Sequence, residues 1–174
     1  QHAGIKPDVM TLANGLGSGM PVGACLAAGP AAGVFKPGNH GSTFGGNPLA
    51  CTAALTTLNI LEQDNLLYHA TTTGNFLLQG FHEHLGQHHG VVSIRGQGLM
   101  IGIELNRPCG ELVQQALEQG LLINVTADTV VRLLPPLIYT REHAQTVIDT
   151  LAPMIADFVA KQPAAPPQPA LQSA

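Results

Sequence analysis

Charged side chains are scarce in this sequence of 174 residues. Asp, Glu, Lys and Arg together make up 10% of it, against about 25% in an average globular domain. A lone domain with so few charges would be poorly solvated. We therefore expect either that a partner covers much of its surface or that the chain is a piece of a larger protein. Gln1 at the first position, in place of methionine, favours the second expectation.

Three further absences exclude classes of partner and site. The formal net charge of −4 argues against nucleic acid or an anionic membrane as the main partner. No apolar run reaches the ~20 residues that a membrane-spanning helix needs. The three cysteines, Cys25, Cys51 and Cys109, are odd in number and widely spaced, so they form neither a disulfide framework nor a zinc signature. This usage predicts a reducing, cytoplasmic setting.

Glycine is abundant and gathers in one stretch, residues 7–48. Because glycine has no Cβ, such a stretch lets backbone approach a ligand closely. Apolar runs within it predict a buried strand over 8–13 and a second strand over 21–27. The remainder is expected to form loops over 14–19 and 38–46, with short helical turns over 30–35.

Helical periodicity begins at Asn47 and Pro48, which are favoured at the cap and the first position of a helix. This first helix is predicted to end near residue 63, and Asp64 is expected to cap a second one that runs to residue 85. The side chains expected to face inward are Ala50, Ala54, Leu58 and Leu61 in the first helix and Leu67, Ala70, Leu77, Phe81 and Leu85 in the second.

Strands and helices alternate in the rest of the chain. Strands are predicted over 91–95, 99–105, 121–125 and 129–134, and a helix over 110–119 ends at Gly120. Thr140 is expected to cap a last helix to residue 161, which Pro153 should kink or break near Leu151. Its inward positions are Val147, Ile148, Leu151, Ile155 and Phe158. Residues 162–174, rich in proline and alanine, predict a disordered tail.

The loop over residues 40–46 has the features of an anion site. Ser42 and Thr43 offer adjacent hydroxyls just ahead of a helix N-terminus, whose dipole and unpaired N–H groups favour negative charge. A phosphate group is the natural occupant. A tight turn in which both hydroxyls cap locally is the alternative.

Two motifs in tandem, TLANGLGSGMPVGA and HGSTFGGNPLA, resemble the subgroup III (ornithine-type) aminotransferases, which use pyridoxal 5'-phosphate. The likeness continues through RGQGLMIGIEL and VVRLLPPL into the last helix, and is greatest to members of the acetylornithine type. The resemblance implies an α/β chain of fold type I. Residues 1–63 would be the C-terminal part of a large cofactor-binding domain, and residues 64–161 a small C-terminal domain.

The resemblance also implies a reaction and its residues. The amino group of N-acetylornithine would move to 2-oxoglutarate in arginine biosynthesis, in a homodimer whose site is shared across the interface. Thr43 would bind the phosphate of the neighbouring subunit's cofactor, and Ser42 would lie by the substrate. Arg132 would hold the substrate α-carboxylate, since arginine binds a carboxylate with two parallel hydrogen bonds. A surface arginine on an edge strand is the alternative for Arg132.

Asn14 departs from the family pattern. It stands where the family has the lysine that forms the Schiff base with the cofactor; the separation to Thr43, 43 − 14 = 29 residues, matches the family. A carboxamide is neither a nucleophile nor a base, and loss of acid–base help alone costs roughly 10²–10⁴-fold in rate. An engineered exchange, a sequence error and a natural loss of catalysis remain open as origins of Asn14.

Other functions stay open as well. A different ω-aminotransferase, acting on ornithine, succinylornithine or 4-aminobutyrate, fits the same motifs. A catalytically silent domain that binds cofactor or partner fits Asn14. The family's acidic partner of the pyridine nitrogen, its ring-stacking aromatic and its second phosphate loop would precede residue 1. His82, His84, His88 and His89 cluster, but Gly86 interrupts the helix between them, so we expect a solvated helix end and no metal site.

Overall fold

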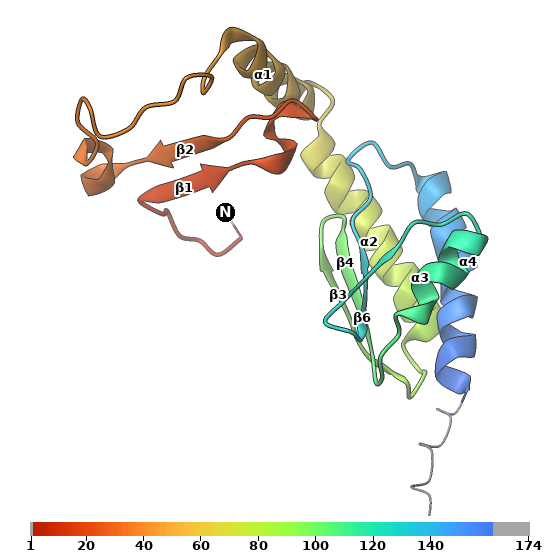
Figure 1. Ribbon diagram of the computed structural model, residues 1–174. Coiled ribbons are helices and arrows are strands. Elements are labelled where there is room, and N and C mark those ends of the chain that lie inside the picture. Colours follow the sequence, from red (N-terminus) through yellow and green to blue (C-terminus); the bar gives the residue numbers. More distant parts are fainter. Residues whose placement is uncertain (1, 162–174) are drawn as a thin grey trace, which may run out of the picture. The chain divides into compact units, whose positions relative to one another are not determined.

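The computed structural model describes residues 2–161, and the chain divides into two compact units, Gln1–Leu66 and Leu67–Ala174. Figure 1 follows both units along the chain. The domain boundary expected near residue 63 falls just ahead of this division. The tail expected over 162–174 lies outside the described residues.

The first unit is a two-stranded hairpin followed by a helix. Strand β1 (Val9–Leu12) pairs antiparallel with β2 (Ala24–Ala27), in a register that places Leu12 opposite Ala24. Two short 3₁₀ turns, η1 (Asn14–Gly17) and η2 (Gly29–Gly33), lie in the connecting segments. The long helix α1 (Pro48–Gln63) closes the unit, and it packs against η1.

This unit buries little apolar surface, which corrects the expectation of a buried first strand. Val9 and Met10 on β1 are 50% and 45% exposed, and on α1 Ala50 is buried whereas Leu58 is 46% exposed. The reason is geometric: a two-stranded hairpin with one helix is too small to enclose a core of its own. An apolar run predicts that its side chains are buried, but it does not identify the segment that packs against them.

The junction between α1 and α2 (Leu66–Leu85) also differs from expectation. Asp64 follows α1 at its C-terminal boundary and does not cap α2, and Asn65 takes a left-handed φ of 50°. The turn changes which leucine faces inward: Leu66 is buried, while Leu67, expected inward, is 67% exposed.

The second unit is a four-stranded antiparallel sheet packed against helices. The strands are β3 (Val91–Gln97), β4 (Met100–Leu105), β5 (Asn124–Thr126) and β6 (Val130–Leu133), in the spatial order β3-β4-β6-β5. Helices α2, α3 (Glu111–Glu118) and α4 (Arg141–Ala160) supply the rest of the core. The mixture confirms the predicted α/β class.

The core of this unit lies between one face of the sheet and the helices. Alternate residues of the central strands are buried against it: Leu99, Ile101, Ile103 and Leu105 along β4 and the residue before it, and Val131 and Leu133 on β6. The alternation predicted for 99–105 is thereby confirmed. The opposite face of the sheet carries the polar residues of the same strands, as expected of a half-buried antiparallel sheet.

Helix α4 agrees with its prediction except at the proline. Thr140 caps it, accepting a hydrogen bond from the His143 N–H at 3.2 Å, and all five side chains expected inward are buried. The helix nevertheless runs unbroken through Pro153. Pro153 is exposed, so water can satisfy the carbonyl that loses its helical partner, and the helix tolerates the residue.

Candidate functional site

Asn14 lies at the end of β1, at the first position of η1. Its side chain is exposed, and its backbone takes a left-handed φ of 37°, which asparagine tolerates better than most residues. The following residues wind tightly, with the Leu16 N–H donating to the Ala13 carbonyl at 3.0 Å and the Ser18 N–H to the Gly15 carbonyl at 3.2 Å. Asn14 is therefore an exposed residue at the start of a tight turn.

Gly17 shows why this turn needs glycine. It is buried, and a Cβ built on it would lie 2.7 Å from Cγ1 of Val22. Any larger residue would push the segment before β2 away from the turn. The glycine-rich pattern here supports a compact loop, and the exposed group that it offers is the Asn14 amide, which can hydrogen-bond but cannot attack a carbonyl carbon.

The loop before α1 uses its two hydroxyls differently. Oγ of Ser42 accepts a hydrogen bond from the Gly45 N–H at 2.9 Å, so Ser42 stabilises the loop while its hydroxyl proton remains able to donate. Thr43 is exposed and its hydroxyl has no hydrogen-bond partner among residues 2–161. Both readings of the loop thus apply: Ser42 takes part in a local turn, and Thr43 is open to a ligand.

Asn47 caps α1 and limits the anion site at its N-terminus. Its Oδ1 accepts from the Ala50 N–H at 3.0 Å, and its Nδ2 donates to the Phe44 carbonyl at 2.9 Å. One of the unpaired N–H groups of the first turn is therefore already satisfied. Asn14 and Thr43 belong to the same unit, but no hydrogen bond joins them within the described part of the chain.

Arg132 lies in the second unit, on β6. Because β6 pairs with β4 on one side and β5 on the other, Arg132 stands on an interior strand, which rules out an edge strand as its setting. Its neighbours Val131 and Leu133 are buried in the core, so the side chain of Arg132 projects from the opposite, exposed face of the sheet. Val131 and Leu133 thus fix the strand in the core, while Arg132 points into solvent.

The four arginines of the chain differ in their partners. Nη1 of Arg95 lies 2.6 Å from Oε2 of Glu104, an ion pair on the exposed face. Arg107 and Arg141 each stack at 4.1 Å over a phenylalanine ring. Arg132 has no ionic, aromatic or hydrogen-bond partner among the residues described. It is therefore the arginine best suited to receive a carboxylate from outside.

The histidines at the end of α2 do not assemble into a metal centre. Nδ1 of His84 lies 2.8 Å from the Gly80 carbonyl, and α2 ends at Leu85 before His88. Within residues 2–161, no three His, Cys, Asp or Glu side chains gather closely enough to hold an ion. None of the helices described is long and apolar enough to cross a membrane.

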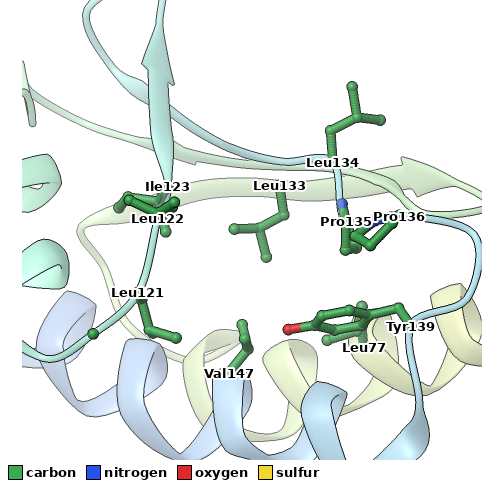
Figure 2. Close-up of a pocket in the computed structure, with 11 residues that line it drawn as sticks. Leu77, Leu121, Leu122, Ile123, Leu133, Leu134, Pro135, Pro136, Tyr139 and Val147 are labelled. Atoms are coloured by element: carbon green, nitrogen blue, oxygen red, sulfur yellow. The ribbon is translucent and has the colours of Figure 1, made fainter. Parts of the chain in front are cut away.

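An apolar cavity of about 390 Å³ lies on the helix side of the sheet. Figure 2 shows aliphatic side chains around it, with Leu133 and Val147 on facing walls and Tyr139 at one end. Burial raises the pKa of the Tyr139 phenol, whose hydroxyl donates to the His143 carbonyl at 3.3 Å. The cavity contains none of the residues proposed for chemistry and has no charged group to bind a charged substrate.

Two other perturbed groups lie apart from the candidate residues. Burial raises the pKa of the Cys109 thiol, which disfavours the thiolate and argues against a nucleophilic cysteine there. Hydrogen bonds from its own backbone N–H and from Thr140 lower the pKa of Glu142 at the start of α4. Both effects follow from local packing and capping.

Comparison with known proteins decides the family. Residues 1–155 match the family described as Aminotransferase class-III. The chain belongs to this family.

Class-III relatives match almost the whole chain. The acetylornithine aminotransferase of Nitrosomonas europaea is 57% identical over 159 residues, which are 91% of this chain and 40% of that protein. The crystal structure of the acetylornithine aminotransferase of Elizabethkingia anophelis gives a TM-score of 0.80 at 34% identity, over 90% of this chain and 41% of that one. The chain therefore spans about two fifths of the length of its relatives.

A second similar structure is an ornithine aminotransferase of Toxoplasma gondii, described with partial occupancy of PLP at its active site. It gives a TM-score of 0.84 at 30% identity, over 92% of this chain and 39% of that one. These matches confirm the predicted class-III aminotransferase fold. Sequence reasoning did not find the ion pair of Arg95 with Glu104 beside Arg132, because the register between β3 and β4 brings these residues together and no pattern within either strand states it.

Proposed function

We propose that this chain is part of an aminotransferase that moves the amino group of N-acetylornithine to 2-oxoglutarate. The observation that carries the proposal is Arg132, exposed on an interior strand and without a partner among the described residues. The 57% identity to an acetylornithine aminotransferase supports this amino donor over ornithine, because the ornithine enzymes among the similar structures are 30–34% identical.

In this proposal Arg132 orients the substrate. Its guanidinium donates two parallel hydrogen bonds to the α-carboxylate of the amino acid or keto acid, which fixes the direction of the Cα substituents. Because Val131 and Leu133 hold the strand in the core, the arginine keeps a defined origin on the sheet. Ser42, whose hydroxyl proton remains able to donate, is proposed to lie by the rest of the substrate.

Pyridoxal 5'-phosphate is the proposed cofactor, and it would supply the electron sink that amino-group transfer requires. The chain fits one end of that molecule. Thr43 offers an exposed hydroxyl and the loop offers backbone N–H groups beside a helix N-terminus, the chemistry that binds phosphate. The chain does not fit the other end, since position 14 holds an amide where a covalent bond to the aldehyde needs an amine.

The same amide supports a second candidate, a class-III chain that binds cofactor or partner without turnover. Asn14 can hydrogen-bond a ligand, whereas it can neither attack it nor carry a proton. A homodimer, in which Thr43 of one subunit serves the phosphate site of the other, and a cytoplasmic setting complete the proposal. Cys25, Cys51 and Cys109, all free thiols, are compatible with such a setting.

One substitution tests the assignment of position 14. We expect the unaltered chain to give no turnover with N-acetylornithine and 2-oxoglutarate, and no borohydride-reducible adduct with the cofactor. Asn14→Lys should gain an adduct that peptide mass spectrometry locates at residue 14. Asn65→Lys, which also places lysine at an exposed left-handed position, is the matched control. Turnover by the unaltered chain, or an adduct elsewhere in Asn14→Lys, would refute the assignment of position 14.

A further inference from the structure

Two arginines stand on either side of one glycine on the open face of the sheet. The register pairs Gly102 of β4 with Arg95 of β3 and with Arg132 of β6. Glu104 lies two residues further along β4 and therefore projects from the same face. Diagonal neighbours in such a sheet are about 7–8 Å apart, within reach of long side chains. Glu104 is thus a diagonal neighbour of both arginines and could pair with either.

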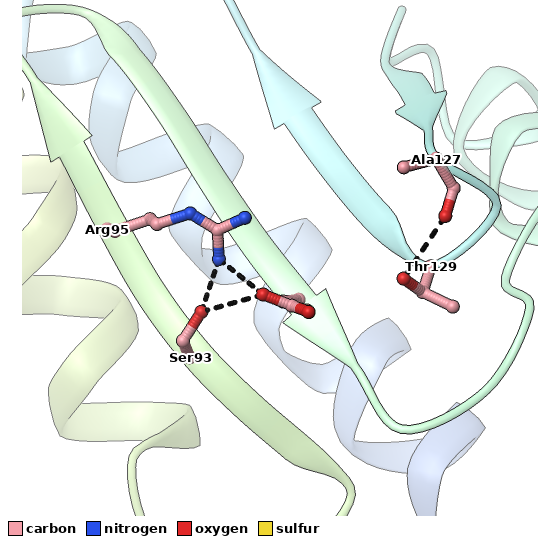
Figure 3. A network of polar contacts seen from close by, with 5 residues as sticks. Ser93, Arg95, Ala127 and Thr129 are labelled. Carbon is pink, nitrogen blue, oxygen red and sulfur yellow. Dashed lines mark hydrogen bonds and ion pairs between the residues drawn. The ribbon is translucent and has the colours of Figure 1, made fainter.

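Glu104 pairs with Arg95. Its Oε2 lies 2.6 Å from Nη1 of Arg95 and accepts a hydrogen bond from Oγ of Ser93 at 3.2 Å, and Arg95 also donates to Oγ of Ser93. Figure 3 shows Ser93 and Arg95 side by side on β3, both joined to the carboxylate by dashed lines. All three groups form one closed polar network, which directs the carboxylate toward β3.

The two strands beside Glu104 differ at the position directly opposite it. On β3 this position is Ser93, whose hydroxyl donates to the carboxylate, and on β6 it is Val130, which has no polar group. Gly102 places no side chain between the arginines, and a Cβ there would lie 3.3 Å from Cγ1 of Val130, closer than an ordinary van der Waals contact. The hydrogen bond from Ser93 therefore favours Arg95 over Arg132 as the partner of Glu104, and no side chain at Gly102 stands between them.

We propose that Arg95 and Ser93 are positioning residues that hold Glu104 away from Arg132 and so keep the Arg132 guanidinium open to a substrate carboxylate. Without them, Glu104 would pair with Arg132 and compete with the substrate for the same donors. The identity of the incoming carboxylate rests on the proposed function; the competition between the two arginines for Glu104 does not.

Selective chemical modification of arginine tests the proposal on the 174-residue chain itself. p-Hydroxyphenylglyoxal reacts with unpaired guanidinium groups, and peptide mass spectrometry gives the rate at each arginine. In Arg95→Gln we expect the rate at Arg132 to fall by about two- to fivefold, the range expected when an exposed guanidinium gains an ion pair. The double variant Arg95→Gln/Glu104→Gln, which restores the summed charge of the original pair, should return the rate to that of the unaltered chain.

Ser93→Val distinguishes a new pairing of Glu104 with Arg132 from a general change in the electrostatic potential around Arg132. It leaves every charge in place and makes β3 match β6 opposite Glu104, so slower modification of Arg132 in this variant reports a redirected carboxylate. Arg107, which stacks over Phe158, serves as the internal reference. An unchanged Arg132 rate in both Arg95→Gln and Ser93→Val would overturn the proposal, as would a slowed rate that persists in the double variant.

A separate measurement tests the proposed function. In the unaltered chain 2-oxoglutarate should protect Arg132 from modification more than it protects Arg107. Absence of protection would refute the substrate role of Arg132. The modification rates at Arg132 in the variants would still test the pairing of Glu104. The two failures are therefore distinguishable in one set of samples.

Discussion

Gly74 on α2 lies directly against Gly98 in the turn between β3 and β4. A Cβ built on Gly74 would overlap the Gly98 carbonyl oxygen, so no side chain fits at this position. Gly98 in turn takes a left-handed φ of 55°, which glycine accommodates without strain. The helix and the hairpin therefore meet through two glycine backbones, and this contact sets how closely α2 approaches the sheet.

Gly74→Ala should destabilise the second unit. In an exposed helix the exchange would be favourable, but here the methyl group must displace backbone, and overpacking of this kind costs about 1–3 kcal/mol. Urea unfolding followed by circular dichroism measures the change. Gly110→Ala is the control, because nothing lies within 4 Å of a Cβ at Gly110 and its φ is negative. A Gly74→Ala variant as stable as the control would contradict the close contact.

Tyr139 should ionise above its ordinary pKa of 10.0, since burial disfavours the charged phenolate. The chain has two tyrosines, so in Tyr68→Phe the absorbance change on ionisation reports Tyr139 alone. A raised folded-state pKa means that this group's contribution to stability is complete below pH 10 and is lost as the pH rises through the folded-state pKa. A folded-state midpoint equal to that in denaturant would contradict the burial of Tyr139.

Thr140→Ala should weaken helix α4 at its first turn. The substitution removes the hydroxyl that accepts from the His143 N–H, and loss of such a cap costs about 0.5–2 kcal/mol. Thermal unfolding of the chain gives the comparison. Thr150→Ala is the matched control, because its hydroxyl donates to a carbonyl one turn back within α4 and caps no terminus. Equal losses in both variants would show that the cap contributes nothing specific.

Thr43→Ala should weaken binding of pyridoxal 5'-phosphate to the Asn14→Lys chain. Removing one hydrogen bond to a charged phosphate costs about 1.5–3 kcal/mol, which is roughly a tenfold or greater loss of affinity. Binding of pyridoxal, which lacks the phosphate, should not change. Thr52→Ala is the control, because that hydroxyl donates within α1 to the Pro48 carbonyl. An equal loss for both ligands would show that Thr43 does not act on the phosphate.

Local patterns predicted most of the second unit. The alternation through 99–105, the Thr140 cap and the spacing of the apolar residues in α4 depend on neighbours in sequence, and each is found in the structure. Predictions of burial that required packing against segments distant in sequence were wrong. Val9 and Leu58 are exposed because the short hairpin and α1 do not enclose them, and Leu67 is exposed because Asn65 turns the chain first.

The sequence by itself determined the family, the candidate residues and the absence of an amine at position 14, because these are properties of residue identity and spacing. Tertiary structure decided the exposure of those residues and which side chains lie beside them. Strand order placed the exposed Arg132 on an interior strand of the sheet, and strand register put Glu104 between two arginines. A register joins residues far apart in sequence through backbone hydrogen bonds, so no local pattern states which arginine the carboxylate meets.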